Sequence, residues 1–236
     1  MAKRPVFVPM LDGPAFVSTT YVDFEWSPGM ALSQSQKSIT ALHVAARELI
    51  GSDMILEISS KSKQEIGIKL SAFNLKIRTL KYKQEFSVEC AYQASKVFEL
   101  GGPFPDILGK TSLDAKRDPR LTKFGRMTKF SFFGTNWELE PRTAFYDWLY
   151  MNALHKHPAY ADEVLGYSAF TDIAFNPERS INCQAYAAAL YVSLTKRGIL
   201  NTVFLRDQSR YLETVASMKV SNAHEDTVEQ SRMTFD

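Results

Sequence analysis

The stretch that decides the fold is Ser87-Val88-Glu89-Cys90-Ala91-Tyr92-Gln93-Ala94-Ser95-Lys96-Val97-Phe98. At about 100° per residue, a helix over this stretch gathers apolar and small side chains on one side, namely Val88, Ala91, Tyr92, Ser95 and Phe98. Glu89, Gln93 and Lys96 fall within about 60° of one another on a different face. A carboxylate, an amide and an ammonium group sharing a face indicate either a solvated surface or a polar site.

The composition is that of a soluble globular protein. The chain has 236 residues, of which 45% are hydrophobic and 23% charged, with a formal net charge of +2. No run approaches the roughly 18 apolar residues of a membrane span, and the short apolar run after Arg4 does not make a signal peptide. Cys90 and Cys183 are too few for a disulfide framework or a thiolate zinc site. We therefore expect a cytoplasmic protein with no membrane partner.

One segment has a marked excess of positive charge. Its basic side chains are Lys110, Lys116, Arg117, Arg120, Lys123, Arg126 and Lys129. Such a basic stripe can contact phosphate groups. A solvated surface explains it equally well.

Periodicity and turn signals predict a single mixed domain of the α+β class, predominantly helical with a small sheet. Strands are expected within 6–26, at 55–58, as a pair within 66–86, and at 130–133. Helices are expected over 33–49, 87–98, 143–155 and 180–197, with short ones within 103–129. Ser180 is the predicted N-cap of the last helix, and Gly198 is its predicted stop.

Several familiar catalytic motifs are missing from the sequence. Gly109-Lys110-Thr111 is not a P-loop, because Phe104 stands where the first glycine is required. Neither a Gly-x-Ser-x-Gly elbow nor a His-Glu-x-x-His motif occurs. His155 and His157 have no third ligand nearby in the sequence, and histidines at a helix C-terminus commonly serve only the helix dipole. The sequence thus predicts no metal site and leaves carboxylate chemistry as the main candidate.

Four segments together resemble the ordered motifs of the NADAR superfamily. They are Leu70-Ser71-Ala72-Phe73, the stretch Glu89–Phe98, Asn136-Trp137-Glu138 and Ile181-Asn182-Cys183-Gln184. The segment Glu89–Phe98 is the specific one, since its Glu, Tyr, Gln, Ala, Lys and Phe all keep the family spacing. The other three segments support the resemblance mainly because they occur in the family order. The resemblance covers about residues 66–197.

The sequence also departs from the superfamily pattern. Ala72 stands where the family usually has Asn, Cys90 replaces a His, and residues 170–177 replace a glycine-rich loop. Together with residues 24–29 and 33–38, this pattern resembles the NADAR antitoxins found beside DarT-type DNA ADP-ribosyltransferases. We accordingly divide the chain into three parts. Residues 1–65 are an N-terminal extension packed on the core, and residues 66–205 are a NADAR-like catalytic domain. Residues 206–236 are a polar tail that we expect to be partly disordered.

The resemblance implies a metal-free N-glycosidase that needs no cofactor. In the antitoxin branch this hydrolase removes ADP-ribose from guanine bases in DNA, which repairs the modification made by the toxin. The bond that breaks joins the anomeric carbon of ribose to a base nitrogen, and its cleavage passes through a cationic sugar. A nearby carboxylate can stabilise that charge and orient or deprotonate the attacking water. Glu89 is the candidate for this role.

The same motifs imply further site residues and partners. Trp137 and Asp172 join Glu89 as candidate catalytic residues, although an ordinary core aromatic explains Trp137 equally well. Lys96 suits a diphosphate as a point charge. The other candidate substrate-binding residues are Ser71, Phe73, Asn74, Tyr92, Gln93 and Asn182. The expected partners are ADP-ribosylated DNA, presented single-stranded or distorted, and a cognate DarT-type toxin.

Two other functions stay open on the sequence. The protein could neutralise a toxin by direct contact without catalysis, through its aromatic N-terminal segment around Phe7, Phe16 and Phe24. Alternatively, it could be an N-glycosidase that acts on a small nucleotide intermediate.

Overall fold

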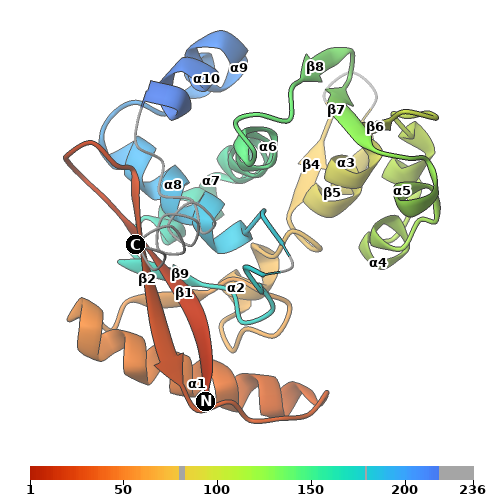
Figure 1. The fold of residues 1–236 in the computed structure, drawn as a ribbon. Helices are drawn as coiled ribbons and strands as arrows, with labels where there is room; N and C mark the ends of the chain where they lie inside the picture. The colour runs from red at the N-terminus through yellow and green to blue at the C-terminus, as the bar shows by residue number, and fades with distance from the viewer. Residues whose placement is uncertain (80–82, 179, 218–236) are drawn as a thin grey trace, which may run out of the picture.

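A four-stranded sheet carries helices on both of its faces (Figure 1). The computed structural model describes residues 1–79, 83–178 and 180–217. The strand order is β2-β1-β9-β3, with bounds Val17–Phe24, Ala2–Pro9, Ala169–Thr171 and Ile55–Glu57. β1 and β2 form an antiparallel hairpin, and β9 joins this hairpin to β3, lying antiparallel to β1 and parallel to β3.

Alternate side chains of β1 pack into two separate apolar clusters. Val6 packs with Ile39 and Leu42 of α1 (Leu32–Ile50) on one face of the sheet. Phe7 lies on the other face, where its ring meets the edge of Tyr186 of α8 (Gln184–Lys196) at a centroid distance of 5.6 Å. The N-terminal hairpin is therefore covered on both faces.

Two helices, α6 (Ala144–His155) and α8, pack against each other in the centre of the molecule. Trp148 of α6 donates a hydrogen bond from Nε1 to the carbonyl of Leu205, at 2.8 Å, which ties the C-terminal helices to α6. The smaller helices around this pair are α2 (Glu65–Lys69), α7 (Pro158–Val164), α9 (Thr202–Arg206) and α10 (Gln208–Ser217).

The short helix α3 (Val88–Ala94) adjoins two small sheets. Ser87 caps the helix by accepting a hydrogen bond from the backbone N of Cys90. One sheet pairs β4 (Lys76–Arg78) with β5 (Glu85–Ser87). The other contains β6 (Lys96–Phe98), β7 (Met127–Phe132) and β8 (Thr135–Trp137), and the β6–β7 connection carries a 3₁₀ helix (Pro105–Gly109), α4 (Ser112–Lys116) and α5 (Arg120–Lys123).

The α+β class is confirmed, but the predicted helix over 87–98 is too long. It ends at Ala94, where the Ser95 hydroxyl donates to the carbonyl of Ala91 at 2.7 Å. Residues Lys96–Phe98 then pair with β7 as a strand, because the tertiary pairing of Lys96 with Phe130 outweighs the local helical pattern. The helical placement of Lys96 was therefore wrong.

The predicted strand pair within 66–86 is present as β4 and β5. Two other expectations need correction. Cys183, rather than Ser180, is the N-cap position of α8, because an irregular segment with a bend precedes the helix. In the expected polar tail, residues 208–217 form α10, whereas 218–236 lie outside the described residues.

Among the helices of the described ranges, none combines the length and the apolar character that a membrane-spanning segment needs.

Candidate functional site

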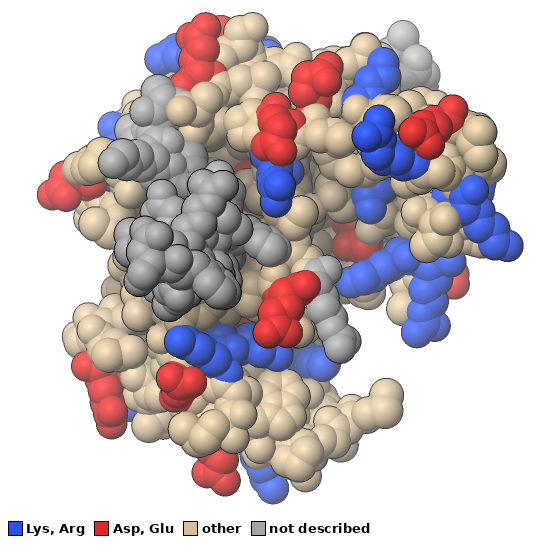
Figure 2. Space-filling model, viewed as in Figure 1, with Lys and Arg blue, Asp and Glu red and all other residues tan. Residues whose placement is uncertain are grey.

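A pocket of about 480 Å³ lies between the start of α3, the end of β9 and the start of α8. Its volume is in the range typical of small-molecule sites. Eight of the ten predicted site residues line it: Ser71, Phe73, Glu89, Tyr92, Gln93, Lys96, Asp172 and Asn182. Figure 2 shows that this face of the molecule is deeply notched between the part carrying α4 and the part carrying α1, with Lys and Arg on both walls.

Glu89 lies in the first turn of α3 and is only 7% exposed. Its backbone N donates to the carbonyl of Ala72 at 2.9 Å, which fastens the turn at 71–73 to the start of the helix. Its Oε1 accepts a hydrogen bond from Nε2 of Gln93, one helical turn away, at 2.9 Å. The carboxylate is thus held in one position at the pocket wall.

Two amide side chains leave oxygen acceptors in the pocket. Asn182 donates from Nδ2 to the hydroxyl of Tyr92 at 2.6 Å. Oδ1 of Asn182 and Oε1 of Gln93 are buried and accept no hydrogen bond from the described residues. Buried acceptors without partners are costly unless a ligand or water supplies a donor. They are therefore well suited to sugar hydroxyls.

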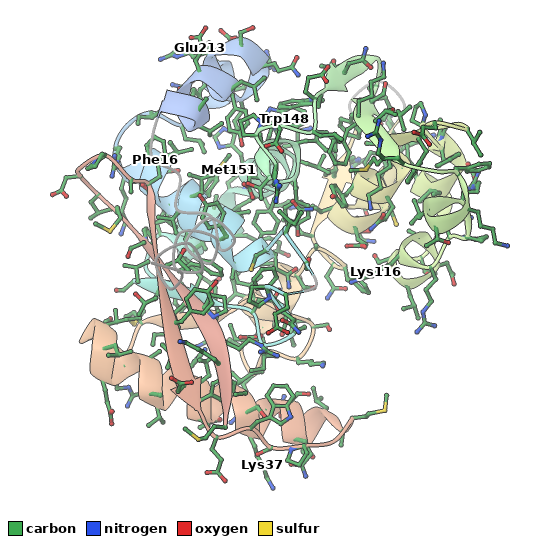
Figure 3. All side chains as sticks on the ribbon, in the orientation of Figure 1. Phe16, Lys37, Lys116, Trp148, Met151 and Glu213 are labelled. Atoms are coloured by element: carbon green, nitrogen blue, oxygen red, sulfur yellow. The ribbon has the colours of Figure 1, made fainter. Side chains whose placement is uncertain are left out.

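Two ammonium groups line the same pocket. Nζ of Lys96 lies 4.8 Å from the ring centre of Tyr92, and Nζ of Lys116, at the end of α4 (Figure 3), lies 5.6 Å from that of Phe73. Neither lysine forms an ion pair with a described carboxylate. Burial lowers the pKa of Lys96 to about 8; Glu89 opposes this shift and Lys116 adds to it. Two lysines without a direct ion-pair partner in one pocket favour an anionic ligand.

Asp172, 8% exposed, follows directly on β9. Oδ1 accepts from the backbone N of Ala174 and of Phe175, at 2.9 and 3.2 Å. Burial, reinforced by the neighbouring carboxyl of Glu57, raises the pKa of Asp172 to about 7. Such a carboxyl can hold or release a proton at neutral pH.

Gln184, the first residue of α8, ties three pocket segments together. Its Oε1 accepts from the backbone N of Ala72 at 2.6 Å, and its Nε2 donates to the carbonyl of Ile58 at 2.6 Å and to Oδ2 of Asp172 at 3.0 Å. The pocket walls are thus connected through one side chain.

Glu57 supports Asp172 from behind and is 2% exposed. It accepts hydrogen bonds from the hydroxyls of Ser59 and Thr171, both at 2.7 Å, and from the backbone N of Ile173 at 2.9 Å. Burial raises the pKa of Glu57. His43 of α1 lies 2.9 Å from the Thr171 hydroxyl, so the network extends to the helix behind the sheet.

Two predicted residues lie outside the pocket. Trp137 is 2% exposed and packs on Phe145 and Trp148, at centroid distances of 5.5 and 4.8 Å, in the aromatic core behind Tyr92. This location fits the core interpretation of Trp137, and it gives no support to substrate stacking. Asn74 is exposed and donates to the carbonyl of Ile68, where it stabilises the turn.

In the basic stripe at 110–129, Lys110, Arg120 and Arg126 form ion pairs, whereas the other four cations, Lys116, Arg117, Lys123 and Lys129, have no ion-pair partner among the described residues. Arg120 contacts both Asp106 and Asp118, at 2.6 and 2.8 Å, and Lys110 also contacts Asp118 at 2.7 Å. Within the described ranges, no three His, Cys, Asp or Glu side chains gather closely enough to hold a metal ion.

The sequence predictions missed Glu57, Gln184 and Tyr146, which also lines the pocket, and they named Lys116 only as a member of the basic stripe. A glutamate inside the apolar strand Ile55–Glu57 was a signal for a buried carboxyl. Gln184 stood within a quoted motif, but nothing in its spacing predicted its three hydrogen bonds.

The sequence matches a family model described as "DarT1-associated NADAR antitoxin" over residues 2–225. The chain belongs to this family. Comparison with curated protein sequences finds no match. The family match includes the N-terminal segment that lies outside the superfamily motifs, and in the antitoxin this segment supplies β1, which pairs with β9 just before Asp172.

Proposed function

We propose that this NADAR antitoxin is a DNA ADP-ribosyl glycohydrolase, an N-glycosidase that removes ADP-ribose from guanine bases in DNA and so reverses the action of a DarT-type transferase. The observation that carries the proposal is the presence, in one pocket, of the held carboxylate of Glu89 and of two lysines that form no direct ion pair with a described carboxylate. The carboxylate suits a cationic sugar, and the lysines suit a diphosphate.

The reaction breaks the bond between the anomeric carbon and the base nitrogen, and the electron pair stays on the nitrogen. A water oxygen forms the new bond to the anomeric carbon. Glu89 stabilises the developing sugar cation and takes a proton from the water, and Asp172 in its protonated form supplies a proton to the departing base. The pKa of about 7 keeps both forms of Asp172 populated near neutrality.

The other pocket residues bind the adduct. Lys96 and Lys116 contact the diphosphate, and the free acceptors of Gln93 and Asn182 receive hydrogen bonds from ribose hydroxyls. Because the pocket holds an adduct and not a duplex, the modified base is presented from single-stranded or distorted DNA.

Release of free ADP-ribose from an oligonucleotide carrying ADP-ribosylated guanine tests the proposal. We expect release by the purified protein in excess chelator, because the residues assigned to the chemistry are carboxylates and lysines. No release with or without added divalent metal would contradict the proposed activity, and release only with metal would contradict the carboxylate mechanism.

Direct neutralisation of the toxin is the main rival function. Phe7, Phe16 and Phe24, around which the sequence placed the toxin contact, are 0%, 4% and 2% exposed, so these three side chains are not available for it. Two measurements on cells that produce the transferase distinguish hydrolysis from direct neutralisation. They are cell survival and the number of modified bases in the extracted DNA. A Glu89→Gln variant should fail to rescue and modified bases should accumulate, whereas a neutralising binder would rescue with few modified bases. If the protein were instead a glycosidase for small nucleotides, even the parent protein with Glu89 intact would leave the modified bases on the DNA.

A further inference from the structure

A second concave surface, with a volume of about 890 Å³, lies apart from the candidate active site. We call it the basic groove. It is formed by the β4–β5 hairpin, the C-terminal end of α6 and the helix α9. Its Lys and Arg side chains are Lys76, Arg78, Lys83, Lys156 and Arg206, and all five residues are exposed.

None of these five cations has an ion-pair partner among the described residues. Glu85, opposite Arg78 in the hairpin register, is the single acidic residue among those described in the lining. Lys156 and Arg206 are close enough for Arg206 to add to the effect of burial in lowering the pKa of Lys156. Like charges gathered in a concavity favour an anionic ligand with several charges.

Hydrogen bonds fix the groove walls relative to one another. Nε2 of His157 lies 2.8 Å from the carbonyl of Lys76, which joins the end of α6 to β4. Nε2 of His155 lies 3.1 Å from the hydroxyl of Thr202, which joins α6 to α9. Lys76 and Arg78 project from the same face of β4, on either side of buried Ile77. The cations are thus displayed along a preformed surface.

The groove begins close to the candidate active site. Phe73 lines the active-site pocket and Lys76 lines the groove, three residues further along the chain. Three residues span at most about 11 Å, which is about the rise of three stacked nucleotides. At this point the Cα atoms of the two linings are therefore no further apart than a few nucleotides of single strand can span.

We infer that the basic groove binds the phosphodiester backbone of the single DNA strand whose adduct enters the active-site pocket. This inference rests on the proposed function for its choice of strand, but its test needs no hydrolysis. Phosphate contacts of this kind position a strand without reading its sequence.

The test is binding of an unmodified single-stranded oligonucleotide, measured by fluorescence anisotropy over a range of salt concentrations. The groove variant is Lys76→Gln/Arg78→Gln/Lys156→Gln. The control variant removes the same charge from exposed lysines elsewhere, Lys3→Gln/Lys37→Gln/Lys196→Gln, of which Lys37 is marked on α1 in Figure 3. Thermal melting of both variants checks that they are folded.

Each phosphate contact to a single strand contributes about −0.7 to the slope of log affinity against log salt. The groove variant should therefore bind roughly tenfold or more weakly, with a slope shallower by about two, while the control variant binds like the parent. Equal loss in the two variants, or no binding of the strand by the parent at low salt, would overturn the inference. Loss of binding to the cognate transferase with DNA binding intact would identify the groove as a protein interface and also overturn it. An inactive pocket would leave this binding result unchanged, so the two proposals can fail separately.

Discussion

Replacing Asp147 by asparagine should change how the stability of the protein depends on pH. Asp147 lies in the first turn of α6, is 2% exposed, and has a carboxyl oxygen, Oδ1, that accepts no hydrogen bond from the described residues. Burial raises its pKa from 3.8 to about 8, and a hydrogen bond from Thr143 only partly opposes this shift.

The sign and size follow from the two pKa values. Between about pH 4 and pH 8 the unfolded chain has lost the Asp147 proton while the folded chain keeps it, so the free energy of unfolding falls as the pH rises. Each tenfold change in proton affinity is worth about 1.4 kcal/mol. The loss therefore reaches about 4 kcal/mol at pH 7 and about 5 kcal/mol at pH 8.

The assay is urea denaturation, followed by circular dichroism, at a series of pH values. An Asp147→Asn variant should unfold with nearly the parental free energy at pH 4 and be more stable by several kcal/mol at pH 7. His43, whose pKa is lowered to about 4 by burial, makes stability rise with pH up to about 6.5, but it does so equally in parent and variant and cancels in their difference. Asp162→Asn, on the exposed face of α7, is the control. A difference between parent and Asp147→Asn that does not grow from pH 4 to pH 7 would refute the reasoning.

Three further substitutions test individual site residues. Lys96→Ala should raise KM for the modified oligonucleotide by roughly tenfold with a smaller effect on kcat, because the diphosphate loses a cation; an unchanged KM would remove Lys96 from the binding site. Asp172→Asn should lower kcat and abolish the decline in rate that the parent shows as the pH rises through about 7, and a pH profile identical to the parent's would exclude Asp172 as the proton donor. Trp137→Phe should lower the melting temperature while KM stays at the parental value, and a large rise in KM at normal stability would show that Trp137 contacts substrate.

Local sequence patterns predicted the parts of the site that lie close together along the chain. Glu89 and Gln93 are one helical turn apart, so periodicity alone placed them side by side. Lys96 lines the same pocket, but it lies on strand β6 and not on the helix. The pairing of β6 with β7 joins segments that are distant in the sequence, so helical periodicity could not predict it.

Residues whose contacts join segments nearly half the chain length apart escaped prediction. Glu57 and Thr171 are 114 residues apart, and Ala72 and Gln184 are 112 apart, yet these pairs hold Asp172 and the pocket walls in place. The pairing of the basic side chains could not be predicted from the sequence either. Counting charges along the sequence could not reveal that Asp106 and Asp118 pair with Arg120, or that unpaired cations from three separate elements meet in the basic groove.

The most direct test of the proposed function is the single-turnover rate of ADP-ribose release by a Glu89→Gln variant, with adduct binding measured on the same preparation. The substitution keeps the size of the side chain and removes the charge that stabilises the sugar cation, and Glu48→Gln, on the exposed side of α1, is the matched control. We predict a rate lower by roughly 10²-fold or more with adduct binding retained, and a parental rate in the control. Release at the parental rate by the Glu89→Gln variant would contradict the proposed role of Glu89 in catalysis.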